Sequence, residues 1–187
     1  MNPRPTRRAS ERGSTLIEVL ITIVILAIGL LSLAALQMRL QANELESYQR
    51  AQAITLLDDM RSRIEANRRN AASYITGTSS PLGSGMTCPT DATTRQAIDA
   101  YQWCQALQGS AETLSGKVGA MIGARGCIEQ MSAGSYMLTI AWQGVLPLAA
   151  PPSTVGCGAN LYNDTAKCTA DRCRRVINTV VNIGTLN

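Results

Sequence analysis

The apolar residues of the chain are concentrated near its N-terminus. Residues 19–38 form a run without a single charge, bounded by Glu18 and Arg39. As a helix rising about 1.5 Å per residue, this run would be roughly 30 Å long, which matches the hydrocarbon core of a bilayer. We therefore expect a transmembrane helix here. A cleaved secretory signal fits less well, because its apolar region is shorter, about 7–15 residues, and Ser32-Leu33-Ala34 is a poor cleavage site.

A second pattern follows in residues 39–69. Apolar residues recur every three or four positions, as on one face of an amphipathic helix; they are Leu45, Tyr48, Ala51, Ile54, Leu57, Met60 and Ile64. Opposite charges stand four residues apart, each pair stabilising a helix by about 0.2–0.5 kcal/mol, in Glu46/Arg50, Asp59/Arg63, Arg61/Glu65 and Glu65/Arg69. No proline occurs between Thr6 and Ser80, so one helix over residues 16–69 is predicted. A coiled coil is the alternative, although fewer than four heptads are present.

The rest of the chain has the pattern of a small domain with both helix and strands. Residues 76–91 are rich in Gly, Ser, Thr and Pro and indicate a loop. Residues 92–107 suit a short helix, and strands are predicted at 126–131, 136–143 and 174–183. The connection over residues 144–171 contains three prolines and is expected to be irregular. Together these elements predict an α+β fold, with a small antiparallel sheet packed on the outer half of the long helix.

All six cysteines lie beyond the apolar run, at Cys88, Cys104, Cys127, Cys157, Cys168 and Cys173. An even number in a segment exported across a membrane predicts up to three disulfides, and fifteen full pairings are possible. We expect Cys88–Cys104, which a short helix-containing loop separates, and Cys157–Cys173 as a weaker second pair that would tie the proline-rich connection. A zinc site including Cys168 and Cys173 is the alternative, although the chain has no histidine.

The net charge of +4 comes from the N-terminus. Four of the 17 basic residues and one of the 13 acids precede residue 14, so the remainder, with 13 basic and 12 acidic residues, is nearly neutral. Arginines on this side of the apolar run predict a cytoplasmic N-terminus and an exported C-terminal domain. The basic character therefore indicates membrane orientation, and a nucleic-acid partner is not expected.

The junction of the basic and apolar segments is distinctive. Gly13 is followed by Ser14-Thr15-Leu16-Ile17-Glu18-Val19, and then by the uncharged run. In these features the chain resembles type IV prepilins and the pseudopilins of type II secretion, whose leader ends in glycine before a T-L-I-E-V stretch. It departs from the family pattern at Ser14, where those proteins usually carry phenylalanine.

The resemblance implies a ladle-shaped fold and a set of site residues. Prepilin peptidase would cleave between Gly13 and Ser14, and the new terminus at Ser14 would be N-methylated. Glu18 would be the glutamate that pairs with the terminal amine of a neighbouring subunit during assembly. The chain would then consist of a leader (1–13), a transmembrane and assembly helix (14–38), the amphipathic half of that helix (39–69) and a disulfide-stabilised pilin domain (70–187).

Later stretches resemble the PilV-type minor pilins, also known as type IV pilus modification proteins. They are residues 60–68, residues 136–144 and Cys173-Arg174-Arg175. This resemblance implies a minor pilin that initiates, caps or modifies a pilus. Its partners would be other minor pilins, the major pilin, prepilin peptidase and the inner membrane. It would be an inner-membrane protein with a periplasmic C-terminal domain before assembly, and part of the pilus afterwards.

Two other functions remain open from the residues alone: a minor pseudopilin of type II secretion, and a signal-anchored periplasmic binding module. Enzymatic activity is not expected. Without histidine the chain has no imidazole for acid–base catalysis or metal binding, and its glycines follow no phosphate-loop spacing. We expect neither a cofactor nor a metal. Trp103 and Trp142 are predicted in the core, and Arg172, Arg174 and Arg175 at a solvated end of a strand.

Overall fold

The computed structural model describes residues 15–110, 121–163 and 166–184. The chain forms two compact units that divide between Gln41 and Ala42. Helix α1 (Leu16–Ala66) begins in the first unit and ends in the second. The predicted long helix is therefore present but ends three residues before Arg69. A 3₁₀ helix, η1 (Arg68–Tyr74), follows it.

The second unit contains a four-stranded antiparallel sheet in the order β1-β2-β3-β4. Its strands are β1 (Leu82–Gly83), β2 (Arg125–Ser132), β3 (Ser135–Gln143) and β4 (Arg174–Asn182). The three long strands match the prediction within one residue at each end. Strand β1 was missed, because two residues inside a Gly- and Ser-rich loop carry no strand pattern. The predicted α+β class is confirmed.

Helix α2 (Arg95–Leu107) begins three residues later than predicted. The hydroxyl of Thr94 accepts a hydrogen bond of 3.1 Å from the backbone N–H of Ala97, which makes Thr94 the N-cap. Between β2 and β3, Gly134 adopts a positive φ of 75° and allows a tight turn.

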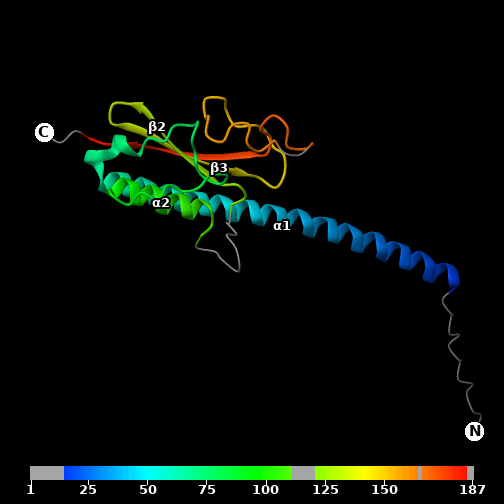
Figure 1. Ribbon diagram of the computed structural model, residues 1–187. Coiled ribbons are helices and arrows are strands. Elements are labelled where there is room, and N and C mark those ends of the chain that lie inside the picture. Colours follow the sequence, from blue (N-terminus) through cyan, green and yellow to red (C-terminus); the bar gives the residue numbers. More distant parts are fainter. Residues whose placement is uncertain (1–14, 111–120, 164–165, 185–187) are drawn as a thin grey trace, which may run out of the picture. The chain divides into compact units, whose positions relative to one another are not determined.

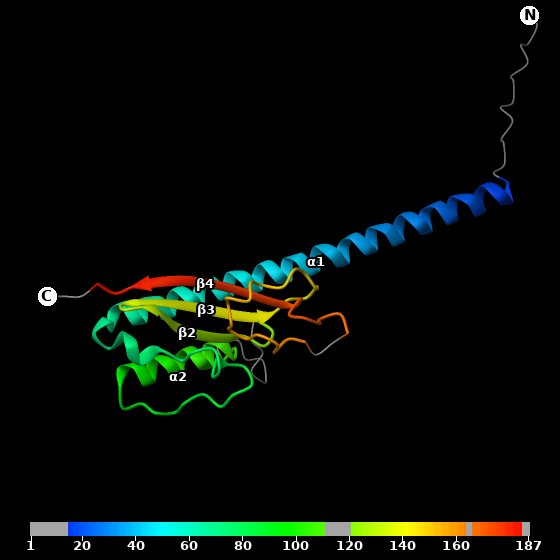
Figure 2. The same ribbon diagram turned by 90° about the horizontal axis from the view of Figure 1, so that it is seen from above.

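One core lies between the helices and the sheet (Figures 1 and 2). Helix α1 contributes Ala53, Leu57, Met60 and Ile64, α2 contributes Trp103 and Leu107, and alternate residues of β3 face them. The indole of Trp103, fully buried, donates a hydrogen bond of 2.9 Å to the carbonyl of Leu56. Both predicted core tryptophans, Trp103 and Trp142, are buried.

The buried face of α1 differs from the predicted stripe. Leu45, Tyr48 and Ile54 are 42–50% exposed, whereas Gln49 is fully buried. Successive steps of three residues each fall back by about 60° on a helix of 3.6 residues per turn, so Leu45 and Leu57 cannot share one face. The buried residues instead follow steps of four and three through Gln49, Ala53, Leu57, Met60 and Ile64.

A second, smaller core covers the face of the sheet that points away from α1 and α2, which we call the outer face. It contains Cys127, Ala141, Cys157 and Tyr162, and residues 144–163 and 166–173 supply its cover (Figure 1). Strand β3 is consequently buried on both faces, with all seven residues between its ends buried. The alternating pattern of a strand with one solvated face does not apply to it, because the proline-rich connection folds back over the sheet.

Candidate functional site

The start of α1 has a capping threonine, Thr15, just before it and a carboxylate, Glu18, in its first turn. The backbone N–H of Glu18 lies 3.0 Å from the carbonyl oxygen of Thr15 and 3.4 Å from its hydroxyl. The spacing Thr15-x-x-Glu18 is that of a capping box. A carboxylate in the first turn also interacts favourably with the positive end of the helix dipole. Glu18 therefore stands at the helix end that favours a negative charge.

The first unit of the chain presents an apolar helix surface. Every described residue from Thr15 to Gln41 is exposed, and the helix contains an 18-residue window with a mean hydropathy of 2.9. By length and composition this is the one helix in the described ranges that could cross a membrane. A surface of this kind requires lipid or other helices around it. The predicted cleavage and methylation residues, Gly13 and Ser14, lie outside the described residues.

Comparison with protein families matches residues 8–34 to the prokaryotic N-terminal methylation motif. The chain carries a type IV pilin-like prepilin signal. The matched segment includes the junction at Gly13, the first turn with Glu18 and most of the apolar run. The motif indicates a prepilin of the pilin or pseudopilin kind, a structural protein that assembles with other pilins after processing by prepilin peptidase. No curated protein and no solved structure matched the chain.

Three disulfides join the six cysteines: Cys88–Cys104, Cys127–Cys157 and Cys168–Cys173. The expected pair Cys88–Cys104 is present. The expected pair Cys157–Cys173 is wrong, because Cys157 reaches across the outer face of the sheet to Cys127 on β2, and Cys173 closes a short loop with Cys168. The zinc alternative is wrong as well, since none of these sulfurs is a free thiol.

The arginines at the start of β4 are structural rather than solvated, which corrects the prediction for Arg174 and Arg175. The two neighbours point to opposite faces of the sheet. Arg174, 3% exposed, donates hydrogen bonds of 2.7 and 3.0 Å to the carbonyls of Val155 and Cys157, and pairs with Asp171 at 3.1 Å. It thereby holds the connection against the outer face. Arg172 is exposed, as expected.

Arg175 reaches the other way, to α1, and forms an ion pair with Glu46. The i,i+4 spacing predicts that Glu46 pairs with Arg50, four residues along the helix, and this prediction is wrong. Arg175 also donates to the carbonyls of Arg172 and Leu146, at 3.1 and 2.6 Å. One side chain therefore links strand, helix and connection.

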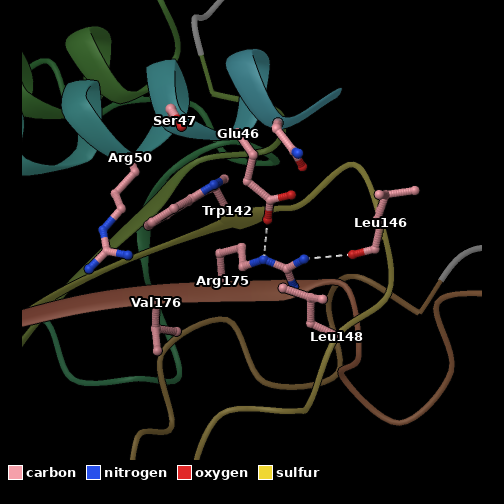
Figure 3. A pocket seen from close by; sticks show the side chains of 9 residues that line it. Glu46, Ser47, Arg50, Trp142, Leu146, Leu148, Arg175 and Val176 are labelled. Atoms are coloured by element: carbon pink, nitrogen blue, oxygen red, sulfur yellow. Dashed lines mark hydrogen bonds and ion pairs between the residues drawn. The ribbon is translucent and has the colours of Figure 1, made fainter. Parts of the chain in front are cut away.

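Beside this ion pair lies a cavity of about 470 Å³, which we call the α1–β4 pocket (Figure 3). Its lining comes from α1, β3, β4 and the connection after β3: Asn43, Glu46, Ser47, Arg50, Trp142, Leu146, Leu148, Arg175 and Val176. No sequence pattern predicts this site, because its residues are spread over more than 130 positions and carry no common motif.

The buried acid Asp99 is the centre of a third polar cluster. It is 1% exposed and accepts from Tyr74 at 2.6 Å and from Arg63 at 2.9 Å, with Arg95 at 3.3 Å. Burial, assisted by the hydrogen bond to Asp99, raises the pKa of Tyr74 to about 12. Three partners bind the Asp99 carboxylate, and they link α1, η1 and α2. We therefore interpret this cluster as structural. Within the described ranges, no group of three potential metal-ligating residues occurs.

Proposed function

We propose that the protein is a minor pilin of a type IV pilus, of the PilV type, which initiates, caps or modifies the filament. The observation that carries this proposal is the methylation motif at residues 8–34, which coincides with the capped start of a long apolar helix. The small antiparallel sheet on the later part of α1 supports it. The three disulfides of the second unit suit a domain that works outside the cytoplasm.

In this proposal, prepilin peptidase cleaves between Gly13 and Ser14 in the inner membrane, and the new terminus is N-methylated. Co-expression with the peptidase should yield a chain that begins at Ser14, as measured by intact mass after membrane extraction. Gly13→Ala should slow or prevent the conversion. Cleavage after Ala34 by the secretory signal peptidase, with no product at Ser14, would contradict the proposal.

Glu18 is the residue we assign to assembly. Cleavage creates an α-amine at Ser14, and parallel helices of neighbouring subunits bring that amine within reach of Glu18. A charge in a membrane costs on the order of 2–3 kcal/mol at full depth, so a helix register that satisfies both the amine and the carboxylate is favoured over one that satisfies neither. Processing would therefore have to precede assembly.

The test of Glu18 compares Glu18→Gln with Glu44→Gln, a matched change at an exposed position of α1 beyond the apolar run. Glu18→Gln should leave membrane insertion and cleavage intact but reduce the amount of protein in sheared pili by about tenfold or more. Glu44→Gln should behave like wild type. Equal incorporation of the Glu18→Gln chain would show that this carboxylate has no part in assembly.

The second candidate is a minor pseudopilin of type II secretion, since the same motif serves both machines. The two differ in what is lost when the gene is deleted: surface pili and twitching in one case, secretion of folded exoproteins in the other. A signal-anchored binding module would lose neither and would keep its leader. Domain 70–187 would be periplasmic in all three cases, and in the pilin and pseudopilin this holds before assembly.

A further inference from the structure

Strand β4 is an edge of the sheet, and half of its backbone groups point away from β3. At its two ends, the N–H of Ile183 donates to the carbonyl of Gly134, and the carbonyl of Cys173 accepts from the N–H of Gly144, both at 2.7 Å. Odd-numbered residues of β4 therefore face β3, because the hydrogen-bonding direction alternates along an antiparallel strand. The even-numbered residues direct their N–H and carbonyl groups outward; they are Arg174, Val176, Asn178, Val180 and Asn182.

Only the region where β4 begins has a partner on this outward side among the described residues. The N–H of Leu148, in the connection after β3, donates to the carbonyl of Arg172 at 2.8 Å. From Val176 to Asn182, the described residues supply no hydrogen bond to the outward backbone groups. Figure 2 shows β4 at the end of the strand order, beyond β2 and β3.

This edge carries none of the features that usually prevent a strand from pairing with another chain. Soluble proteins protect their edges with charged side chains, proline, bulges or very short strands. The opposite edge is β1, which has only two residues, whereas β4 has nine. Residues 176–187 contain no charged side chain and no proline, and β4 stays in register with β3 without a bulge from Arg174 to Asn182. Strand β4 is therefore open to an added strand.

The side chains along β4 indicate which strand would fit. Met137 lies on the outer face, four residues before Ala141 of the second core, and its cross-strand neighbour Val180 is 50% exposed. Neighbouring strands are about 4.8 Å apart, so an aliphatic residue of an added strand would cover Val180. Asn178, exposed two residues earlier, suits a polar neighbour. The edge thus fits an uncharged extended segment with an aliphatic residue opposite Val180.

We propose that β4 accepts an added β-strand from another polypeptide, paired through the outward N–H and carbonyl groups of residues 176–182. The backbone hydrogen bonds hold the segment, and an aliphatic side chain of that segment covers Val180. The edge lies entirely in the second unit and does not depend on cleavage at Gly13 or on Glu18. This proposal and the proposed function can therefore fail separately.

A second copy of the chain is a poorer occupant of this edge. Strand β4 and the later part of α1 run in the same direction (Figure 1). Antiparallel pairing of two β4 strands about a twofold axis would therefore reverse the later part of α1 in one copy relative to the other. Copies anchored in one membrane need these helices to run the same way. We therefore assign the added strand to a different polypeptide.

Two neighbouring valines allow a direct test with the full-length chain in detergent micelles. In ¹⁵N-valine-labelled protein, the N–H of Val180 points outward and that of Val181 faces β3. Without a partner, the Val180 amide should exchange with solvent at least about tenfold faster than the Val181 amide. The variants Val180→Ile and Val181→Ile, each of which lacks one valine signal, assign the two amides.

The probe is the peptide acetyl-Lys-Thr-Val-Thr-Val-Thr-Lys-amide, and its control is the same peptide N-methylated at the five central residues. The unmethylated peptide should move the Val180 amide signal downfield and saturably, with half-saturation at about 1 mM or below. It should also slow the exchange of that amide by about tenfold or more, while Val181 stays unchanged. The control peptide keeps the side chains but lacks the backbone donors, so it should leave Val180 in place.

A pair of variants at Asn178 separates backbone pairing from other effects. Asn178→Pro removes one outward N–H without removing a donor to β3, and should weaken peptide binding by about tenfold or more. Asn178→Thr keeps that N–H and should bind within about twofold of wild type. If Asn178→Pro does not fold, the comparison of the two peptides on the unmutated chain still decides.

Three results would overturn the proposal: an unmoved Val180 signal, equal exchange of Val180 and Val181 in the free chain, or equal binding of both peptides. So would protection of the Val180 amide that grows with protein concentration in the absence of peptide, because a second copy would then fill the edge.

Discussion

The hydroxyl of Tyr74 donates a hydrogen bond of 2.6 Å to Oδ2 of Asp99, and both residues are at most 1% exposed. Arg63 of α1 binds the other carboxylate oxygen at 2.9 Å. These contacts join the three helical elements α1, η1 and α2. Because Asp99 and Tyr74 are buried, loss of either one leaves the other as a desolvated polar group without its partner, so breaking this cluster is costly.

Removal of the Asp99 carboxylate should therefore be costly. Asp99→Ala leaves the buried hydroxyl of Tyr74 without its acceptor and removes one of the two carboxylates that Arg63 pairs with. It should lower the free energy of unfolding by about 3 kcal/mol. Asp58→Ala, at an exposed position on α1, should change it by less than about 0.5 kcal/mol. Urea unfolding followed by circular dichroism of the two variants measures both. Similar midpoints for the two would show that the cluster does not stabilise the fold.

The raised pKa of Tyr74 predicts a loss of stability at high pH. An unfolded tyrosine titrates near 10 and the folded one near 12, so the unfolded state releases its proton first as the pH rises. Stability is fully present below pH 10 and falls as the pH approaches 12. The tyrosine pKa of Tyr162 is also raised by burial, so Tyr74→Phe should reduce this slope without abolishing it. Denaturation at a series of pH values, compared with Tyr74→Phe, tests the assignment; identical slopes would refute it.

The disulfides should differ in their contribution. Cys127–Cys157 closes a separation of 30 residues and Cys168–Cys173 one of 5. In the loop-entropy account the longer bridge stabilises by about 1.6 kcal/mol more at 25 °C. The double variant Cys127→Ser/Cys157→Ser should therefore unfold at a lower urea concentration than Cys168→Ser/Cys173→Ser. It should also be cleaved faster by protease within residues 144–163, which the bridge holds against the sheet through Cys157. The reverse order of midpoints would contradict this.

Gly126 of β2 lies under the indole of Trp103. A Cβ at this position would stand 2.2 Å from the Trp103 ring, which is fully buried. Gly126→Ala should therefore lower the free energy of unfolding by about 3 kcal/mol, at the upper end for an overpacked core. Gly184→Ala, where a Cβ would meet nothing within 4 Å, is the matched control. Tryptophan fluorescence and the urea midpoint together report the outcome, and a Gly126→Ala chain as stable as the control would show that the ring has room.

Local patterns in the sequence determined the elements and the signal. The charge-free run, the absence of proline and the i,i+4 pairs Asp59/Arg63 and Arg61/Glu65 are properties of adjacent turns, and both pairs form. The strands β2, β3 and β4 have enough β-branched and apolar residues to be recognised within one residue. The methylation motif, with Glu18 five positions after Gly13, is likewise a short contiguous pattern.

Only the tertiary structure decided which of several equivalent partners each residue takes. Glu46 has an arginine four residues along the helix, yet it pairs with Arg175, because β4 passes beside that turn of α1. Cys157 had five possible partners, and the fold of the connection after β3 over the outer face of the sheet, in residues 144–163, placed Cys127 beside it. The α1–β4 pocket arises in the same way. Side chains separated by more than 100 residues share a site only after the chain has packed. A local sequence pattern therefore cannot predict that they come together.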